Sequence, residues 1–336
     1  MNEKIENLLK EDRKFPPSEH LVKNANAPSS WYDEASQDRL KFWQKQALTR
    51  ISWFKEPTEI LDDSNPPFFK WFKDGELNLS YNCLDRHLES DGDRVAFYWE
   101  GEPGDTQEIT YQDLYERVCK LSNALKKLGV EKGDRVAIYL GMTPEIVVSM
   151  LACARIGAVH SVVFGGFSSE ALADRINDAK AKTVITADGA WRRGDIVPLK
   201  NNVDGSLELT EYVENVIVVK RTDQEINMTD GRDHWYHDIT DKESSDCEPE
   251  VMNSEDMLYI LYTSGTTAKP KGIVHTQGGY LTGVTTTHHE VFDVKEDDIY
   301  WCAADCGWVT GHSYIVYGPL ANKATSVMYE GAPNAP

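Results

Sequence analysis

The sequence has no long apolar run and no apolar leader. None of its apolar stretches approaches the roughly 20 residues that a membrane-spanning helix needs. The first residues read MNEKIENLLKEDRKF, which carries charges throughout and lacks the uninterrupted apolar core of a secretory signal. We therefore expect a cytoplasmic protein with no membrane partner.

The sequence also lacks the cysteine pairs that commonly hold metals. Its six cysteines are scattered, and none forms a C-x2-C pair. Cys302 and Cys306 are separated by three residues, and only His312 lies close enough in sequence to add a ligand. Because a structural zinc site uses four ligands, we expect no metal site and reduced, mostly buried thiols.

Basic residues are few. The chain has 35 Lys and Arg against 55 Asp and Glu, which gives a formal net charge of −20. Such a surface repels nucleic acid and anionic membranes, so neither is an expected partner, and the charge favours solubility. A polyphosphate ligand would have to be held by local basic groups and backbone N–H donors against the overall field.

Aromatic residues and prolines are frequent at the start of the chain, where apolar periodicity is weak. We expect residues 1–89 to form a segment that wraps around a larger body and packs its aromatic side chains onto it. An interaction platform is the alternative. Residues 90–336 have a regular pattern without internal repeats, which indicates one domain.

Strand and helix patterns alternate through this second region. Apolar runs at residues 94–100, 135–140, 157–164, 183–188, 215–220 and 257–263 predict strands. Thr110, with Asp113 three residues later, marks the start of a helix that Gly129 ends, and Pro144 and Ser168 begin two more helices. The fold class is therefore α/β, with mainly parallel sheets flanked by helices on both faces.

A loop suited to phosphate follows the last of these strands. Residues 262–272 read YTSGTTAKPKG. Glycines let backbone N–H groups approach an anion, hydroxyl groups donate hydrogen bonds and lysines add positive charge. The residues concerned are Thr263, Ser264, Gly265, Thr266, Thr267, Lys269, Lys271 and Gly272. The spacing is neither that of a Walker A loop nor that of the glycine-rich loop of kinases.

This loop closely resembles the phosphate loop of the adenylate-forming enzymes, although Ala268 stands where glycine is usual. Further stretches are similar to acetyl-CoA synthetases within that family: WFKDGELNLSYNCLDRH, VVFGGFS, ITAD, WVTGHSYIVYGPL and YEGAPNAP. The resemblance covers the chain from about Trp31 onward. It implies the amino-terminal part of the large adenylate-forming domain.

The resemblance also implies a two-step ligase that uses ATP, Mg²⁺, acetate and coenzyme A. It places the β- and γ-phosphates of ATP on residues 263–272, with Thr266, Thr267 and Lys271 foremost. It implies an acyl and coenzyme A pocket at Trp308, Val309 and Thr310, and coenzyme A contacts at Gly165, Arg192, Arg193 and Asn334. Asp195 stands where the family has a second arginine. No catalytic residue is identifiable.

Other interpretations of these residues remain open. A core strand leading into a buried helix explains Trp308 equally well, close packing alone explains Gly165, and His312 is expected to be a buried hydrogen-bonding histidine. Because the family continues beyond the point that matches Pro336, we expect the amino-terminal, inactive part of a longer enzyme. The alternatives are a propionyl-CoA or other short-chain acyl-CoA synthetase, and a non-catalytic nucleotide- or CoA-binding module.

Overall fold

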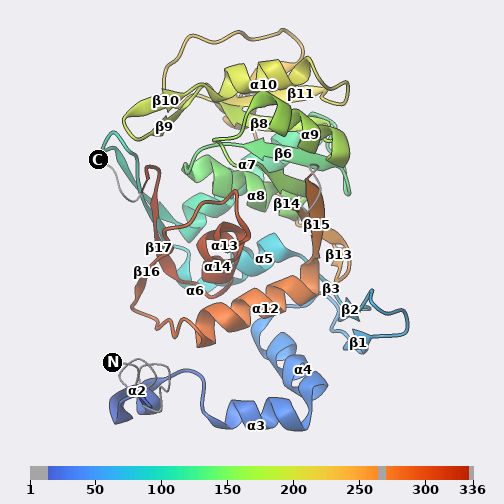
Figure 1. The fold of residues 1–336 in the computed structure, drawn as a ribbon, viewed down its shortest axis with the longest axis vertical. Coiled ribbons are helices and arrows are strands. Elements are labelled where there is room, and N and C mark those ends of the chain that lie inside the picture. Colours follow the sequence, from blue (N-terminus) through green and yellow to red (C-terminus); the bar gives the residue numbers. More distant parts are fainter. Residues whose placement is uncertain (1–13, 264–269, 333–336) are drawn as a thin grey trace, which may run out of the picture.

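A computed structural model describes residues 14–263 and 270–332 (Figure 1). Within these ranges, the largest sheet has seven strands in the order β12-β11-β8-β6-β7-β14-β15. Their bounds are β6 (Arg135–Tyr139), β7 (Val159–Val162), β8 (Thr183–Ala187), β11 (Asn215–Val219), β12 (Asp233–Trp235), β14 (Met257–Thr263) and β15 (Lys271–Thr276). All neighbours are parallel except β14 and β15. The mainly parallel sheet predicted from the sequence is confirmed.

The central strands are apolar because both faces of the sheet are covered. Val184, Ile185, Val216 and Ile217 are fully buried, as expected for parallel strands packed between helices. The helices of this body are α7 (Tyr111–Lys127), α8 (Pro144–Arg155), α9 (Ser169–Ala179), α10 (Leu199–Leu207), α11 (Tyr236–Thr240) and α12 (Gln277–Glu290). Among the described residues, no helix is long and apolar enough to cross a membrane.

Helix α7 begins where its sequence predicts. The Thr110 hydroxyl accepts a hydrogen bond from the Asp113 N–H, and the Asp113 carboxylate accepts one from the Thr110 N–H. These paired bonds satisfy two backbone donors that the first turn of a helix leaves free. Gly129 follows the helix with φ of 83°, a left-handed conformation that favours glycine.

The strand at residues 95–100 belongs to a second sheet and not to the seven-stranded one. This sheet has the order β16-β17-β4-β5 in the described part of the chain. Its strands are β4 (Val95–Glu100), β5 (Thr106–Thr110), β16 (Ile299–Trp301) and β17 (Thr325–Tyr329). β4 pairs antiparallel with β5 in a hairpin and parallel with β17. A hairpin rather than a crossover helix joins β4 to β5, and the chain enters the seven-stranded sheet only after α7, at β6.

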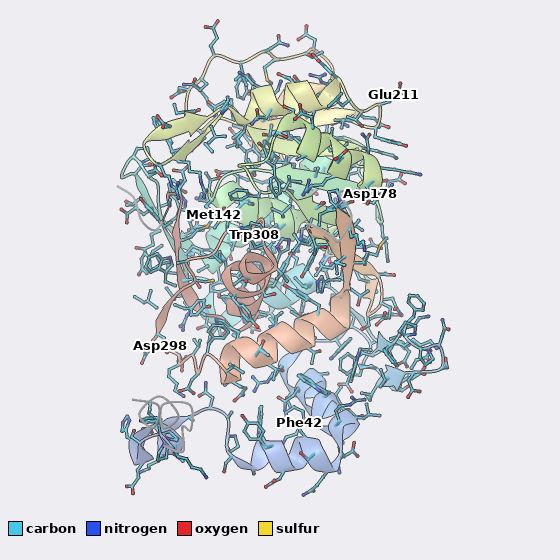
Figure 2. The ribbon with its side chains drawn as sticks, in the orientation of Figure 1. Phe42, Met142, Asp178, Glu211, Asp298 and Trp308 are labelled. Carbon is cyan, nitrogen blue, oxygen red and sulfur yellow. The ribbon has the colours of Figure 1, made fainter. Side chains whose placement is uncertain are left out.

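The amino-terminal segment is built from short elements, and its first three helices lie at one end of the molecule (Figure 1). They are α2 (Glu19–Asn24), α3 (Ser30–Gln37), α4 (Arg39–Arg50), β1 (Leu61–Asp62), β2 (Lys70–Trp71), β3 (Glu76–Leu77), α5 (Leu79–Cys83) and α6 (Asp85–Asp91). β3 pairs with β13 (Met252–Asn253). The Asn26 amide donates to the carbonyls of His289 and Val294, at 2.9 and 3.1 Å, across the end of α12. Phe42 marks the outlying helices in Figure 2.

All six cysteines lie in the described ranges and are free thiols. Cys302 is half-buried and the other five are buried, as the sequence predicted. Burial raises the pKa of the Cys83 and Cys153 thiols to about 12, so both stay protonated at neutral pH.

A buried ion pair joins the amino-terminal segment to the main body. The Arg155 side chain is 1% exposed and donates two hydrogen bonds, each 2.8 Å long, to the Asp85 carboxylate. Its Nε also donates to the Cys247 carbonyl at 2.5 Å. Because α8 and α6 meet at this pair, the loss of one partner leaves a charge buried between them.

We predict that Asp85→Asn lowers the free energy of unfolding by about 3–5 kcal/mol, the usual cost of an unpaired buried charge. Urea unfolding followed by circular dichroism measures this loss. The matched control is Glu34→Gln, which removes the exposed Lys45–Glu34 pair and should cost about 0–1 kcal/mol. Equal losses in both variants would contradict the importance of the buried pair.

Candidate functional site

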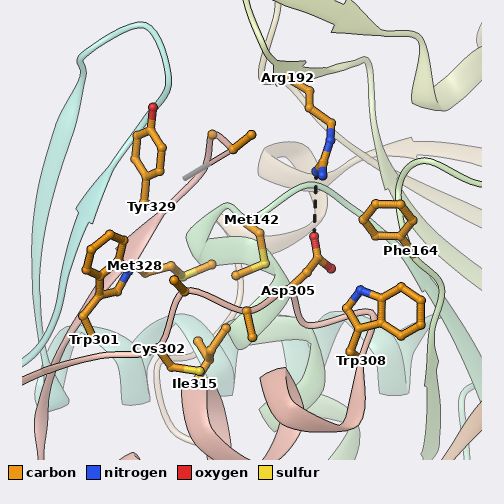
Figure 3. Close-up of a pocket in the computed structure, with 14 residues that line it drawn as sticks. Met142, Phe164, Arg192, Trp301, Cys302, Asp305, Trp308, Ile315, Met328 and Tyr329 are labelled. Atoms are coloured by element: carbon orange, nitrogen blue, oxygen red, sulfur yellow. Dashed lines mark ion pairs between the residues drawn. The ribbon is translucent and has the colours of Figure 1, made fainter. Parts of the chain in front are cut away.

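A cavity of about 330 Å³ lies where the two sheets meet (Figure 3). It opens at the carboxyl ends of β6, β7, β16 and β17, the edge at which α/β folds bind ligands. Apolar side chains form most of its wall, with one arginine and one aspartate facing each other across it. The lining residues are Met142, Phe164, Arg192, Trp301, Cys302, Ala303, Ala304, Asp305, Trp308, Ile315, Met328, Tyr329, Gly331 and Ala332.

Arg192 and Asp305 give the cavity its polarity. The Arg192 Nη1 atom lies 4.0 Å from Asp305 Oδ2, and the guanidinium sits 5.1 Å from the centre of the Phe164 ring. Burial raises the pKa of the Asp305 carboxyl, and the Gly307 N–H and Arg192 oppose this effect. The Arg192 side chain is 38% exposed, so its guanidinium can reach an anionic ligand at the mouth of the cavity.

A tight turn carries Trp308 into the cavity wall. The Asp305 carboxylate accepts a hydrogen bond of 2.7 Å from the Gly307 N–H, and the Asp305 carbonyl accepts one of 3.0 Å from the Trp308 N–H. A Cβ at Gly311 would lie 2.2 Å from the Asp305 carbonyl oxygen, so glycine is required for this close approach. The Trp308 ring then lies 5.9 Å from the Phe164 ring, centre to centre. Figure 2 places Trp308 and Met142 near the middle of the molecule.

The residues predicted around Trp308 are only partly brought together. Trp308 lines the cavity, whereas Val309 and Thr310 are exposed and do not line it. The alternative interpretation, a core strand at Trp308, is wrong: Trp308 precedes the short helix α13 (Val309–Gly311), which continues into η1 (His312–Tyr317), a π-helix, and α14 (Gly318–Ala321). π-Helical turns often occur at functional sites.

The predicted coenzyme A contacts also separate in space. Arg192 reaches the cavity from β9 (Ala190–Arg192), and Arg193 lies exposed at the tip between β9 and β10 (Asp195–Val197). The Gly165 carbonyl accepts a 3.0 Å hydrogen bond from the Tyr139 hydroxyl, and Gly165 does not line the cavity. Asn334 lies outside the described residues.

The two ends of the predicted phosphate loop meet on neighbouring strands. Thr263 ends β14 and pairs with Lys271, the first residue of β15. Gly272 packs closely against Tyr262: a Cβ at position 272 would lie 3.2 Å from the Tyr262 ring. Ser264, Gly265, Thr266, Thr267, Ala268 and Lys269 lie outside the described residues. Thr263 and Lys271 are both exposed.

Sequence reasoning missed most of the cavity wall. Met142 follows β6, Phe164 follows β7, Asp305 follows β16, and Met328 and Tyr329 end β17. Their shared signal is their place at or just beyond the carboxyl end of a parallel strand. That signal becomes useful only once the strand order is known. Across the described ranges, no cluster of three or more His, Cys, Asp or Glu side chains could hold a metal ion.

Comparison with known protein families assigns this architecture. The family model described as "AMP-binding enzyme" matches residues 84–336. The chain belongs to the AMP-binding enzyme family. A second model, described as "Acetyl-coenzyme A synthetase N-terminus", matches residues 29–83.

Curated relatives of this chain include acetyl-coenzyme A synthetases. The one from Streptomyces avermitilis is 61% identical over 100% of this chain, which corresponds to 52% of that relative. The relative from Pasteurella multocida is 52% identical over 98% of this chain and 51% of its own length. The chain thus spans about half the length of these relatives.

A buried histidine lies beneath the turn that carries Trp308. His312 is fully buried, and its Nδ1 lies 3.1 Å from the Trp308 carbonyl oxygen, so the predicted buried hydrogen-bonding histidine is confirmed. Burial lowers the pKa of His312 to about 4, although the Trp308 carbonyl opposes the shift. The ring is therefore neutral at pH 7 and serves the structure of the turn.

We predict that His312 makes the free energy of unfolding fall as the pH drops. An unfolded histidine binds a proton near pH 6.5, but the folded one does so only near pH 4. The unfolded state therefore gains protons first, and stability is lost between about pH 6.5 and 4, by on the order of 1–2 kcal/mol at pH 5.

Urea unfolding at pH 7 and pH 5 tests this expectation. His312→Gln should lower stability at pH 7 and reduce the pH dependence, whereas His237→Gln, at an exposed position, should leave the dependence unchanged. An identical pH dependence in the wild type and His312→Gln would show that His312 does not titrate in this way.

Proposed function

We propose that this chain belongs to an AMP-forming acetate–CoA ligase and supplies its phosphate loop, its acyl wall and its coenzyme A entrance. In the first step an acetate oxygen attacks the α-phosphorus of ATP, and pyrophosphate leaves. In the second, the coenzyme A thiolate attacks the carbonyl carbon of acetyl-adenylate, and AMP leaves with the bonding electron pair. The thiol proton passes to solvent.

The observation that carries this proposal is the cavity with a single guanidinium at its mouth. Its apolar wall between Met142 and Trp308 suits a pantetheine arm and a small acyl group. Arg192 can meet a coenzyme A phosphate, because a guanidinium binds phosphate oxygens through two parallel N–H bonds. Local positive charge of this kind is needed in a chain of net charge −20.

The β14–β15 hairpin supplies the other half of the reaction. Adenylation moves negative charge onto the departing pyrophosphate, and positive groups fixed beside it stabilise the transition state. Lys271 pairs with Thr263 at the ends of the predicted loop, so its ammonium group can contact the β- and γ-phosphates before and after they leave. Mg²⁺ would arrive with ATP as part of the substrate.

Acetate is favoured over larger acids by the names of the relatives and by the bulk of Trp308 in the wall. One methylene group changes binding in an apolar pocket by only about 1–3 kcal/mol. A propionyl-CoA synthetase is therefore the second candidate, and competition between acetate and propionate during adenylation separates the two.

We predict that Lys271→Ala lowers acetate-dependent ATP–pyrophosphate exchange about 100-fold, the usual loss when one transition-state donor is removed, with little change in acetate binding. The measurement uses a protein of the relatives' full length that contains this chain as its amino-terminal part. Lys242→Ala, at another exposed lysine, is the control. Equal losses in exchange and in acetate binding would contradict a role for Lys271 in pyrophosphate departure.

We predict that Arg192→Ala weakens coenzyme A binding to this chain about 10- to 100-fold, the value of a charge-assisted hydrogen bond. Isothermal titration calorimetry with coenzyme A measures the change. The control is Lys220→Ala, which removes one positive charge at an exposed position. If both variants bind coenzyme A as the wild type does, Arg192 is not part of the site. A wild-type chain that does not bind coenzyme A would argue against the ligase.

A further inference from the structure

The hairpin that carries Arg192 has an unfavourable tip. β9 and β10 are joined by two residues, Arg193 and Gly194, with φ of 55° and 80°. Two-residue turns of type I′ require positive φ at both positions and favour Asn-Gly or Asp-Gly. An arginine in the first position is strained, so the tip needs support from outside the hairpin.

Glu102 provides that support. It lies in the turn between β4 and β5, and its carboxylate accepts hydrogen bonds from the backbone N–H groups of both tip residues. The bond from Arg193 N to Glu102 Oε2 is 2.9 Å, and the bond from Gly194 N to Glu102 Oε1 is 2.5 Å. A negative charge shared by two neighbouring N–H groups is a strong anchor. One carboxylate thus ties the tip of the hairpin to the second sheet.

Glu102 is itself held in place by a network of charges. Its N–H donates to the Glu330 carboxylate at 3.1 Å, and Arg221 joins Glu330 to Asp105. The Arg221 guanidinium also lies 5.0 Å from the centre of the Trp99 ring. A Cβ at Gly331, which lines the cavity, would lie 2.8 Å from Glu102 Oε2. The anchor therefore stands at the rim of the cavity.

Among the described residues, the contacts that the Arg192 guanidinium makes are weak. Its ion pair with Asp305 is 4.0 Å long, at the limit of such a contact, and its other partner is the face of Phe164. Arg192 directly precedes the tip and pairs with Asp195 across the hairpin. If the tip shifts, the guanidinium shifts with it.

We propose that Glu102 is a positioning residue for coenzyme A binding: it clamps the tip of the β9–β10 hairpin and so holds the Arg192 guanidinium at the mouth of the cavity, where it meets the nucleotide phosphates. This inference rests on the proposed function, and it adds a residue that never touches the ligand. The proposal also explains why an acidic residue lies beside an anion site. The Glu102 carboxylate accepts hydrogen bonds from two backbone N–H groups, which offset its negative charge.

The test compares Glu102→Ala with the wild-type chain. Coenzyme A and pantetheine, which lacks the nucleotide phosphates, are titrated while tryptophan fluorescence is recorded. We expect Glu102→Ala to raise the Kd for coenzyme A about tenfold, a loss of about 1.4 kcal/mol, with the Kd for pantetheine unchanged. Glu108→Gln, at an exposed glutamate on β5 of the same hairpin, should leave both constants unchanged.

A double-mutant cycle separates positioning from a general structural effect. In the Arg192→Ala background, Glu102→Ala should add almost nothing to the Kd for coenzyme A, because Glu102 acts through Arg192. If Glu102→Ala does not fold, Glu102→Gln, which keeps one acceptor oxygen, should show a smaller increase of the same kind.

Three results would overturn the proposal. One is an unchanged Kd for coenzyme A in Glu102→Ala. Another is an effect that persists in full in the Arg192→Ala background or extends equally to pantetheine. The third is tighter binding, which would mean that phosphate and Glu102 compete for the two N–H groups. A wild-type chain that does not bind coenzyme A overturns the proposed function itself, and this inference with it.

Discussion

The parallel pairing of β17 with β4 is the constraint on which the rest of the site depends. Ser326 of β17 pairs with Phe97 of β4, so a strand near residue 95 gains its neighbour in the sheet from the far end of the described chain. The end of β17 and the residues that follow β6 and β7 line the same cavity. The same pairing brings the β4–β5 turn, with Glu102, against the β9–β10 hairpin.

Charge is distributed so that an anion site can exist within an acidic chain. At the rim of the cavity, carboxylates are committed to specific partners: Glu102 to backbone N–H groups, and Asp105 and Glu330 to Arg221. Asp305 is occupied by the Gly307 N–H and is only loosely paired with Arg192. The Arg192 guanidinium therefore keeps most of its charge for a ligand, although the field of the whole molecule opposes anions.

Local features of the fold could be predicted from sequence, and long-range ones could not. The capping of α7 by Thr110 and Asp113 depends on four consecutive residues, so the pattern alone was sufficient. The placement of β4 in a second sheet depends on a partner more than two hundred residues away, which no periodicity encodes. Within the site, Arg192 and Trp308 were found through family resemblance. Asp305, Phe164 and Glu102 were missed because their roles exist only after the two sheets are packed.

The most direct measurement of the central claim is a crystal structure of this chain with coenzyme A. We expect the nucleotide phosphates within hydrogen-bond distance of the Arg192 guanidinium and the pantetheine arm in the cavity between Met142 and Trp308, with Glu102 still bonded to the hairpin tip. Coenzyme A bound at another face, with the cavity empty, would contradict the assignment of this site.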